Sequence, residues 1–220
     1  LLFDMEVVDA LCLAFSTLGT GGFSSRNASV GAFMNPAVEW VTCAFMILGS
    51  INFALYYRFF TARVGGIWRD TELRAFLLVV MVAFLCVTLV QLPTGEGVSK
   101  TLRDSAFHVS SIVSSTGFMT ADYTAWRPAA QIILLILVFI GGCSGSTAGG
   151  VKVIRWVILA KQSTNETLKM LHPHGIFSIR INGRAGRNDV VYNVSAFFFL
   201  YALLVLITTI ITSISGSDIL

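Results

Sequence analysis

The chain has 220 residues, of which 55% are hydrophobic and 12% are charged, and its formal net charge is +3. A soluble domain carries about 25% charged residues, so this chain has too few polar residues to cover a water-exposed globule. The small net charge gives no indication of a nucleic-acid partner, and none is expected. The composition excludes an ordinary soluble protein and indicates an all-α integral membrane protein.

The chain begins with a segment that is too short and too polar to cross a bilayer. Residues 4–18 carry Asp4, Glu6 and Asp9 in their first turns and end in an uncharged run, and the stretch TLGTGGFSS follows directly. Apolar segments of about 10–14 residues are candidates for re-entrant helices, which enter and leave the membrane on one side. The uncharged residues 40–57 then predict the first spanning helix.

A second series of the same kind follows. Residues 75–92 predict a spanning helix, residues 100–115 predict a second re-entrant helix, and the turn SSTGFMTADY comes next. Residues 128–140 and 151–160 predict the two halves of one spanning helix, because the run GGCSGSTAGG interrupts them. Non-helical backbone at membrane depth is tolerated only where protein buries it or where it lines a wet cavity. The interruption is therefore a candidate functional site.

Residues 190–213 predict the last spanning helix, and the charges indicate an orientation. Residues 58–74 and 152–189 hold 11 of the 15 Lys and Arg residues, whereas eight of the 12 acidic residues lie in the other connecting segments. Basic connections stay on the cytoplasmic side of a membrane. Both re-entrant helices are then expected on the outer side.

The two series form a repeat. Gly22 and Gly117 are 95 residues apart, and Pro36 and Pro128, which each open a helix, are 92 residues apart. Internal repeats are common in transport proteins. The expected fold is therefore an all-α membrane protein of repeated helix–pore loop–helix units, with re-entrant pore helices and one broken inner helix.

The recurring turns have the chemistry of a cation filter. Each follows the C-terminal end of a short helix, where unpaired carbonyls carry about half a negative charge. Glycine adopts positive φ angles without penalty, so successive carbonyls can face one axis and replace the water shell of an ion. No carboxylate lies in residues 17–25 or 114–120, so a cation would not be trapped. Taken alone, each turn is also explained by a glycine helix cap.

These features together resemble the Trk/Ktr/HKT superfamily of potassium transport proteins, and within it the bacterial TrkH-type uptake subunits. The residues that carry the resemblance are Thr20, Gly21, Gly22 and Phe23 in the first turn, Ser115, Thr116, Gly117 and Phe118 in the second, and the run 141–155. Members of the superfamily arrange four non-identical repeats around one pore. The resemblance implies a central fragment that holds the second and third filters and lacks the first and fourth.

The resemblance also implies roles for individual residues. The two turns would form part of a selectivity filter that binds K⁺, the transported ion, through the backbone carbonyls of Thr20, Gly21, Gly22, Thr116 and Gly117. The interrupted helix would form a gating loop made of Gly141, Gly142, Cys143, Ser144, Gly145, Ser146, Thr147, Ala148, Gly149 and Gly150. No catalytic residue and no covalent cofactor is expected.

The same resemblance divides the chain into parts of repeats. Residues 1–62 would hold the pore helix, filter and inner helix of the second repeat, residues 72–161 the third repeat, residues 162–188 a basic cytoplasmic loop, and residues 189–220 the outer helix of the fourth. It implies a multi-pass homodimer in the bacterial inner membrane. Its partners would be membrane lipid and a cytosolic ring of nucleotide-binding, TrkA-like regulatory subunits.

Two other functions are weighed against conduction through a filter. An alternating-access secondary cation transporter would bind its substrate at the broken helix. A membrane-embedded enzyme would need an acid or base near the glycine-rich run, and residues 141–150 contain no His, Asp or Glu. The sequence therefore favours potassium uptake, keeps the alternating-access transporter as the alternative, and gives an enzyme little support.

Overall fold

The computed structural model describes residues 5–61, 68–94, 97–172, 180–182, 184–185 and 188–214. Its α-helices are α1 (Val7–Leu18), α2 (Pro36–Gly49), α3 (Phe53–Thr61), α4 (Thr71–Gln91), α5 (Val98–Val113), α6 (Pro128–Val138), α7 (Val153–Leu171) and α8 (Asn188–Ile214). Short 3₁₀ helices are η1 (Ser29–Phe33), η3 (Leu92–Thr94) and η4 (Tyr123–Ala125), and β1 (Arg180–Ile181) pairs antiparallel with β2 (Arg184–Ala185). The expected helical fold is confirmed.

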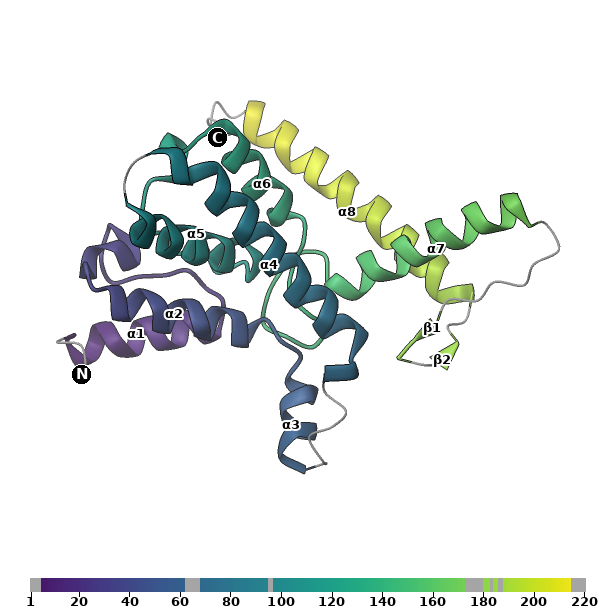
Figure 1. Cartoon of the computed structure of the whole chain (residues 1–220), viewed down its shortest axis with the longest axis horizontal. Coiled ribbons are helices and arrows are strands. Elements are labelled where there is room, and N and C mark those ends of the chain that lie inside the picture. The colour runs from purple at the N-terminus through teal and green to yellow at the C-terminus, as the bar shows by residue number, and fades with distance from the viewer. Residues whose placement is uncertain are drawn as a thin grey trace. The chain divides into compact units, whose positions relative to one another are not determined.

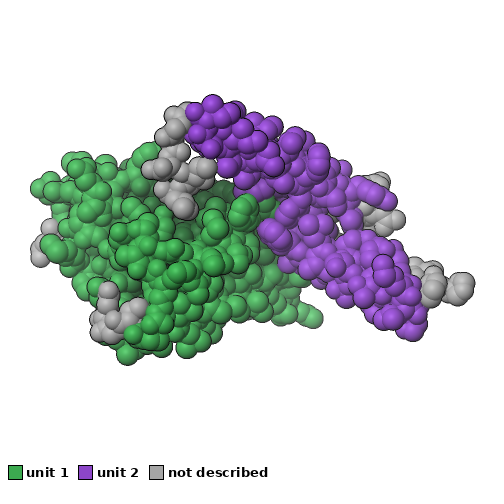
Figure 2. Space-filling view, turned by 90° about the horizontal axis from the view of Figure 1, so that it is seen from above, with its two compact units in different colours: residues 1–154 green, residues 155–220 purple. Residues whose placement is uncertain are grey.

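The chain divides into two compact units, residues 1–154 and residues 155–220 (Figure 2). In the first unit, α5 packs against α2, α4 and α6, and α2 also packs against α1 (Figure 1). The core of this unit joins both short helices and the second turn through the buried side chains of Leu13, Val30, Val38, Cys43, Met46, Phe107 and Phe118. An ion pair also ties α5 to α2, with Arg103 Nε 2.7 Å from Glu39 Oε2.

Two helices among the described residues are long and apolar enough to cross a membrane, namely α4 and residues Val191–Ile214 of α8. They confirm the spanning helices expected at residues 75–92 and 190–213. α1 and α5 have only 12 and 16 residues, as expected for the two short helices. Asp70 begins α4 as its N-cap, because its carboxylate accepts the N–H groups of Glu72 and Leu73 at 3.0 Å each.

The prediction of one continuous spanning helix at residues 40–57 is wrong. α2 and α3 meet at an angle of 88° across a short break. The Ser50 hydroxyl donates back to the Met46 carbonyl at 2.8 Å, and the Asn52 side chain accepts the Ala54 N–H at 2.8 Å and so begins a new helix. Short polar side chains of this kind compete with the helical hydrogen-bond ladder and favour helix ends.

The expected interruption between residues 140 and 151 is present. α6 ends at Val138, and the next helix, α7, begins at Val153. α7 then continues through residues 162–171, the first part of the segment expected as a cytoplasmic loop, with Glu166 accepting from Gln162 at 2.6 Å and from Lys169 at 2.8 Å. In the remainder of that expected loop, residues 180–182 and 184–185 hold the β1–β2 pair, whereas residues 173–179, 183 and 186–187 lie outside the described residues, as does the expected helix end at residues 215–220.

Candidate functional site

The two turns have the same backbone conformation, 95 residues apart. In each, the first and third residues have positive φ angles, which are 49° at Thr20, 71° at Gly22, 58° at Ser115 and 81° at Gly117. A positive φ is uncommon for a residue other than glycine and an outlier for a β-branched one such as Thr20. Such strain persists only where the surroundings hold it in place, and it is frequent at functional sites.

Three backbone hydrogen bonds recur at the same spacing of 95 residues. In the first turn they run from Gly19 to Phe15 (2.8 Å), from Thr20 to Thr17 (3.3 Å) and from Gly21 to Ser16 (2.8 Å). In the second they run from Ser114 to Ser110 (3.0 Å), from Ser115 to Ile112 (2.9 Å) and from Thr116 to Ser111 (2.9 Å). Each short helix therefore unwinds into its turn in the same way, which gives the repeat a structural basis.

The two turns lie against each other. A Cβ added at Gly22 would lie only 2.0 Å from the carbonyl oxygen of Thr116 and 3.6 Å from the carbonyl carbon of Gly117. Only glycine allows this approach at Gly22. The structure thus brings the main chains of the two turns together, with the Thr116 carbonyl directed at the first turn.

The two turns differ in their support. Ser111 donates its hydroxyl to the Phe118 carbonyl at 2.7 Å, and the Phe118 side chain is 1% exposed in the core. The Phe23 side chain is 80% exposed. The first turn instead uses the Thr20 hydroxyl, which lies 2.8 Å from the Gly19 carbonyl and 2.9 Å from that of Thr147 in the glycine-rich run.

Residues 141–150, hereafter the intramembrane loop, are closed at their base. Ile140 and Val151 form an isolated parallel bridge, and the Gly141 N–H donates to the Val151 carbonyl at 3.0 Å. A Cβ at Gly141 would lie 2.0 Å from the Gly149 carbonyl oxygen, so the two limbs of the loop touch. The glycines here serve close packing within the loop.

The break between α2 and α3 receives this loop. The Ser50 carbonyl accepts the Cys143 N–H at 2.8 Å, and the Gly49 carbonyl accepts the hydroxyl of Thr147 at 3.1 Å. The Phe53 N–H in turn donates to the Gly145 carbonyl at 3.1 Å. The bend that the sequence did not predict thus supplies backbone partners for the loop, since a continuous helix would have used the same groups internally.

A carboxylate that sequence reasoning missed also contacts the loop. Glu72, in the first turn of α4, accepts the Ser144 N–H on Oε1 at 2.5 Å and is 8% exposed. The signal in the sequence was weak, because Glu72 is one of several charged residues, Asp70 and Arg74 among them, at the start of this apolar stretch. Its partner, 72 residues further along the chain, is identified only by the fold.

Each short helix also carries a side chain that ties it to the segment following its turn. On α1, Asp9 accepts hydrogen bonds from the Ser25 hydroxyl at 2.6 Å and from Arg26 Nη2 at 2.8 Å, both of which follow the first turn. Hydrogen bonds from Ser25 and then Arg26 hold the pKa of Asp9 below its ordinary value. After the second turn, both ring nitrogens of His108 face backbone carbonyls, that of Asp104 at 2.9 Å and that of Ala121 at 3.0 Å.

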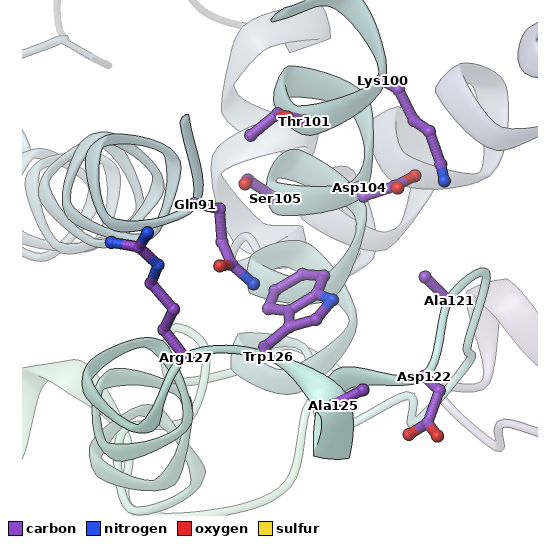
Figure 3. A pocket seen from close by; sticks show the side chains of 10 residues that line it. All are labelled: Gln91, Lys100, Thr101, Asp104, Ser105, Ala121, Asp122, Ala125, Trp126 and Arg127. Carbon is purple, nitrogen blue, oxygen red and sulfur yellow. The ribbon is translucent and has the colours of Figure 1, made fainter. Parts of the chain in front are cut away.

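A pocket of about 340 Å³ lies beside this second tie (Figure 3). Its lining residues are Gln91, Lys100, Thr101, Asp104, Ser105, Ala121, Asp122, Ala125, Trp126 and Arg127. The Trp126 ring packs edge-on against His108 with ring centroids 4.8 Å apart. None of the residues expected in the filter or the loop lines this pocket, so it is separate from the candidate site.

Comparisons with known proteins agree with this architecture. The model of a family described as "Cation transport protein" (TrkH) matches residues 4–218. The potassium uptake protein TrkI of Halomonas elongata is 33% identical over 218 residues, with 99% of this chain and 44% of that protein covered. TrkG of Escherichia coli is 34% identical over 221 residues, with 100% of this chain and 46% of that protein covered.

The fold is also that of a solved relative. The crystal structure of the potassium transporter TrkH from Vibrio parahaemolyticus matches with a TM-score of 0.91 and 33% identity, over 99% of this chain and 47% of that one. This chain therefore spans about half the length of the relatives that it matches. The family model covers nearly the whole chain, and the chain belongs to the TrkH family of cation transport proteins.

Proposed function

We propose that the protein takes up K⁺ by conduction through a filter of backbone carbonyls, to which this chain contributes two turns. The observation that carries the proposal is the recurrence of one backbone geometry in two abutting turns, with positive φ at the first and third residues of each. The carbonyls of Thr20, Gly21 and Gly22 in one turn, and of Thr116 and Gly117 in the other, would replace the water shell of K⁺. The relatives named as Trk potassium uptake proteins support potassium as the ion.

The uncharged surroundings of the turns suit rapid conduction. Passage requires binding that is favourable enough for entry and weak enough for release. Residues 17–25 and 114–120 contain no charged side chain of either sign, and hydroxyl groups hydrogen-bond the backbone instead. Selectivity would then depend on the geometry of the carbonyls.

The intramembrane loop would serve as a gate below this filter. Supporting observations are its position between α6 and α7, its closed base and its bonds to the C-terminal end of α2. The Ser146 hydroxyl donates to the Cys143 carbonyl at 2.6 Å, and the Thr147 hydroxyl donates outward to Gly49. Hydrogen bonds of this kind are individually worth about 1 kcal/mol, so a set of them can be exchanged when the loop moves.

The assignment of repeats and partners belongs to the same proposal. Residues 1–62 would belong to the second repeat, residues 72–161 to the third and residues 189–220 to the fourth, with residues 162–188 as a basic cytoplasmic connection. The complete protein would be a homodimer in a bacterial inner membrane and would bind a TrkA-like regulatory ring through cytoplasmic segments.

Single-channel recording of the complete protein in a planar bilayer tests the proposal. Conduction through a filter predicts unitary K⁺ currents, and removal of residues 143–148 should raise the basal flux. Fluxes of at most about 10³ ions per second, the range of enzyme-like turnover, would contradict conduction and favour the alternating-access transporter. An unchanged or abolished flux after the deletion would contradict the gate.

A further inference from the structure

Glu72 is a buried carboxylate whose acceptor atoms face the intramembrane loop. Its Oε1 accepts the Ser144 N–H at 2.5 Å, and the carboxylate also accepts the backbone N–H of Ile154. Ser144 lies within the loop, and Ile154 lies in the first turn of α7. One side chain of α4 therefore bonds both the loop and the helix that follows it.

This arrangement is not needed to begin α4. Asp70 already caps that helix by accepting the N–H groups of Glu72 and Leu73. A Glu side chain in a first helical turn usually extends into water, yet Glu72 is only 8% exposed. Burying a carboxylate is costly unless it is paired or hydrogen-bonded, and the partners of this one lie on the loop and α7.

The acceptors and donors complement each other across the loop. The first N–H groups of a helix lack intrahelical partners, so the start of α7 offers donors that a carboxylate satisfies well. On the other limb, the Lys152 ammonium donates to the carbonyl of Ala148 and lies 3.5 Å from that of Ser146. A carboxylate thus holds one N–H group of the loop while an ammonium holds loop carbonyls, and charged groups make the stronger hydrogen bonds.

We propose that Glu72 is the latch that holds the intramembrane loop in its closed position. It is a positioning residue that acts on permeation through the loop, and the proposal rests on the proposed gate. Loss of the carboxylate frees Ser144 and the start of α7 together, so the loop detaches from α4. Within the part of the chain that the structure describes, Glu72 forms no hydrogen bond with either turn, so its effect on permeation runs through the loop.

The test compares Glu72→Ala and Glu72→Gln in the complete protein, reconstituted in liposomes without any regulatory subunit. Basal K⁺ flux is one measurement. The other is the labelling rate of Cys143 by a methanethiosulfonate reagent, followed by mass spectrometry of its peptide, because Cys143 lies in the loop and is 0% exposed. Cys43, which lies on α2 and is buried beside Ser110 of α5, serves as the internal control. Glu166→Gln, at an exposed ion pair with Lys169, is the matched charge control.

Glu72→Ala should raise both basal flux and Cys143 labelling about tenfold, the scale of one lost hydrogen bond to a charged group. Glu72→Gln, which keeps a neutral acceptor, should raise both about threefold. Cys43 labelling in the Glu72 variants, and both measurements in the Glu166→Gln protein, should match the wild type. No rise in either folded Glu72 variant would overturn the latch.

The deletion of residues 143–148 separates this result from the proposed function. If the deletion raises basal flux and the Glu72 variants do not, the gate stands and the latch is wrong. If the deletion leaves flux unchanged while Glu72→Ala speeds Cys143 labelling, Glu72 holds the loop but the loop is not the gate, which overturns the latch as a control of permeation.

Discussion

Replacing Gly22 by alanine should lower ion selectivity. The effect should be far larger than that of the same replacement at a glycine without close neighbours. The substitution has two costs. Gly22 has a φ of 71°, and a left-handed conformation costs an L residue about 1–2 kcal/mol. In addition, the new Cβ would lie 2.0 Å from the Thr116 carbonyl oxygen, where an ordinary contact begins at 3.4 Å. The two main chains must therefore separate by more than 1 Å at the contact.

The separation displaces the Thr116 carbonyl, which is one of the proposed K⁺ ligands. If the shift changes the preference for K⁺ over Na⁺ by about 1–2 kcal/mol, the scale of one hydrogen bond to a charged group, the permeability ratio falls about tenfold. The assay is the K⁺/Na⁺ permeability ratio of the complete protein, from reversal potentials under bi-ionic conditions.

Gly97→Ala is the matched control for backbone strain. Gly97 has a φ of 93°, yet a Cβ there would meet no described atom within 4 Å. It lies just before α5, so the substitution carries the cost of a positive φ without the collision. Equal permeability ratios in the Gly22→Ala, Gly97→Ala and wild-type proteins would refute the reasoning, because the carbonyl contact would then have no part in selectivity.

Three further predictions concern the scaffold, each measured by thermal unfolding of the complete protein in detergent. Arg103→Ala should lower the unfolding free energy by about 3 kcal/mol, because it leaves Glu39 buried without its ion-pair partner; an unchanged melting temperature would contradict this. The pKa of Asp9 is lowered in the folded protein, so its contribution is present above pH 3.8, its ordinary value, and is lost as the pH falls through the lower folded value. Asp9→Asn should therefore reduce the fall in unfolding free energy at acidic pH. An identical pH dependence in the variant and the wild type would contradict a stabilising Asp9–Arg26 ion pair. Asn52→Ala should cost about 1 kcal/mol through the lost cap of α3, and no change would show that the cap is dispensable.

The sequence predicted those elements whose cause is local. α4 and α8 follow from uncharged stretches of spanning length, and the interruption after α6 follows from five glycines in ten residues. The unwinding of α1 and α5 into turns follows from glycines after short helices. Each of these depends on residues adjacent in the chain, so composition and spacing sufficed.

The parts that were not predicted depend on contacts between distant residues. Residues 40–57 are uncharged throughout, and the bend at Ser50 and Asn52 is stabilised by a loop about 90 residues further along the chain. The positive φ angles of Thr20 and Ser115 have no signal in residue type, because neither is glycine. Glu72 stands between Asp70 and Arg74, and nothing in that local pattern indicates Ser144 as its partner.

The unequal support of the two turns bears on how a gate and a filter would communicate. The second turn is held by its own short helix and by the core, since Ser111 bonds the Phe118 carbonyl and the Phe118 ring is buried among side chains of α1, α2 and η1. The first turn, beyond its backbone bonds to α1, is also tied to the intramembrane loop by the bond from Thr20 to the Thr147 carbonyl. Because Thr20 is a β-branched residue at a φ of 49°, its conformation depends on that external support. Movement of the loop would therefore reach the filter through the first turn, while the second stays in place as the rigid side of the pore.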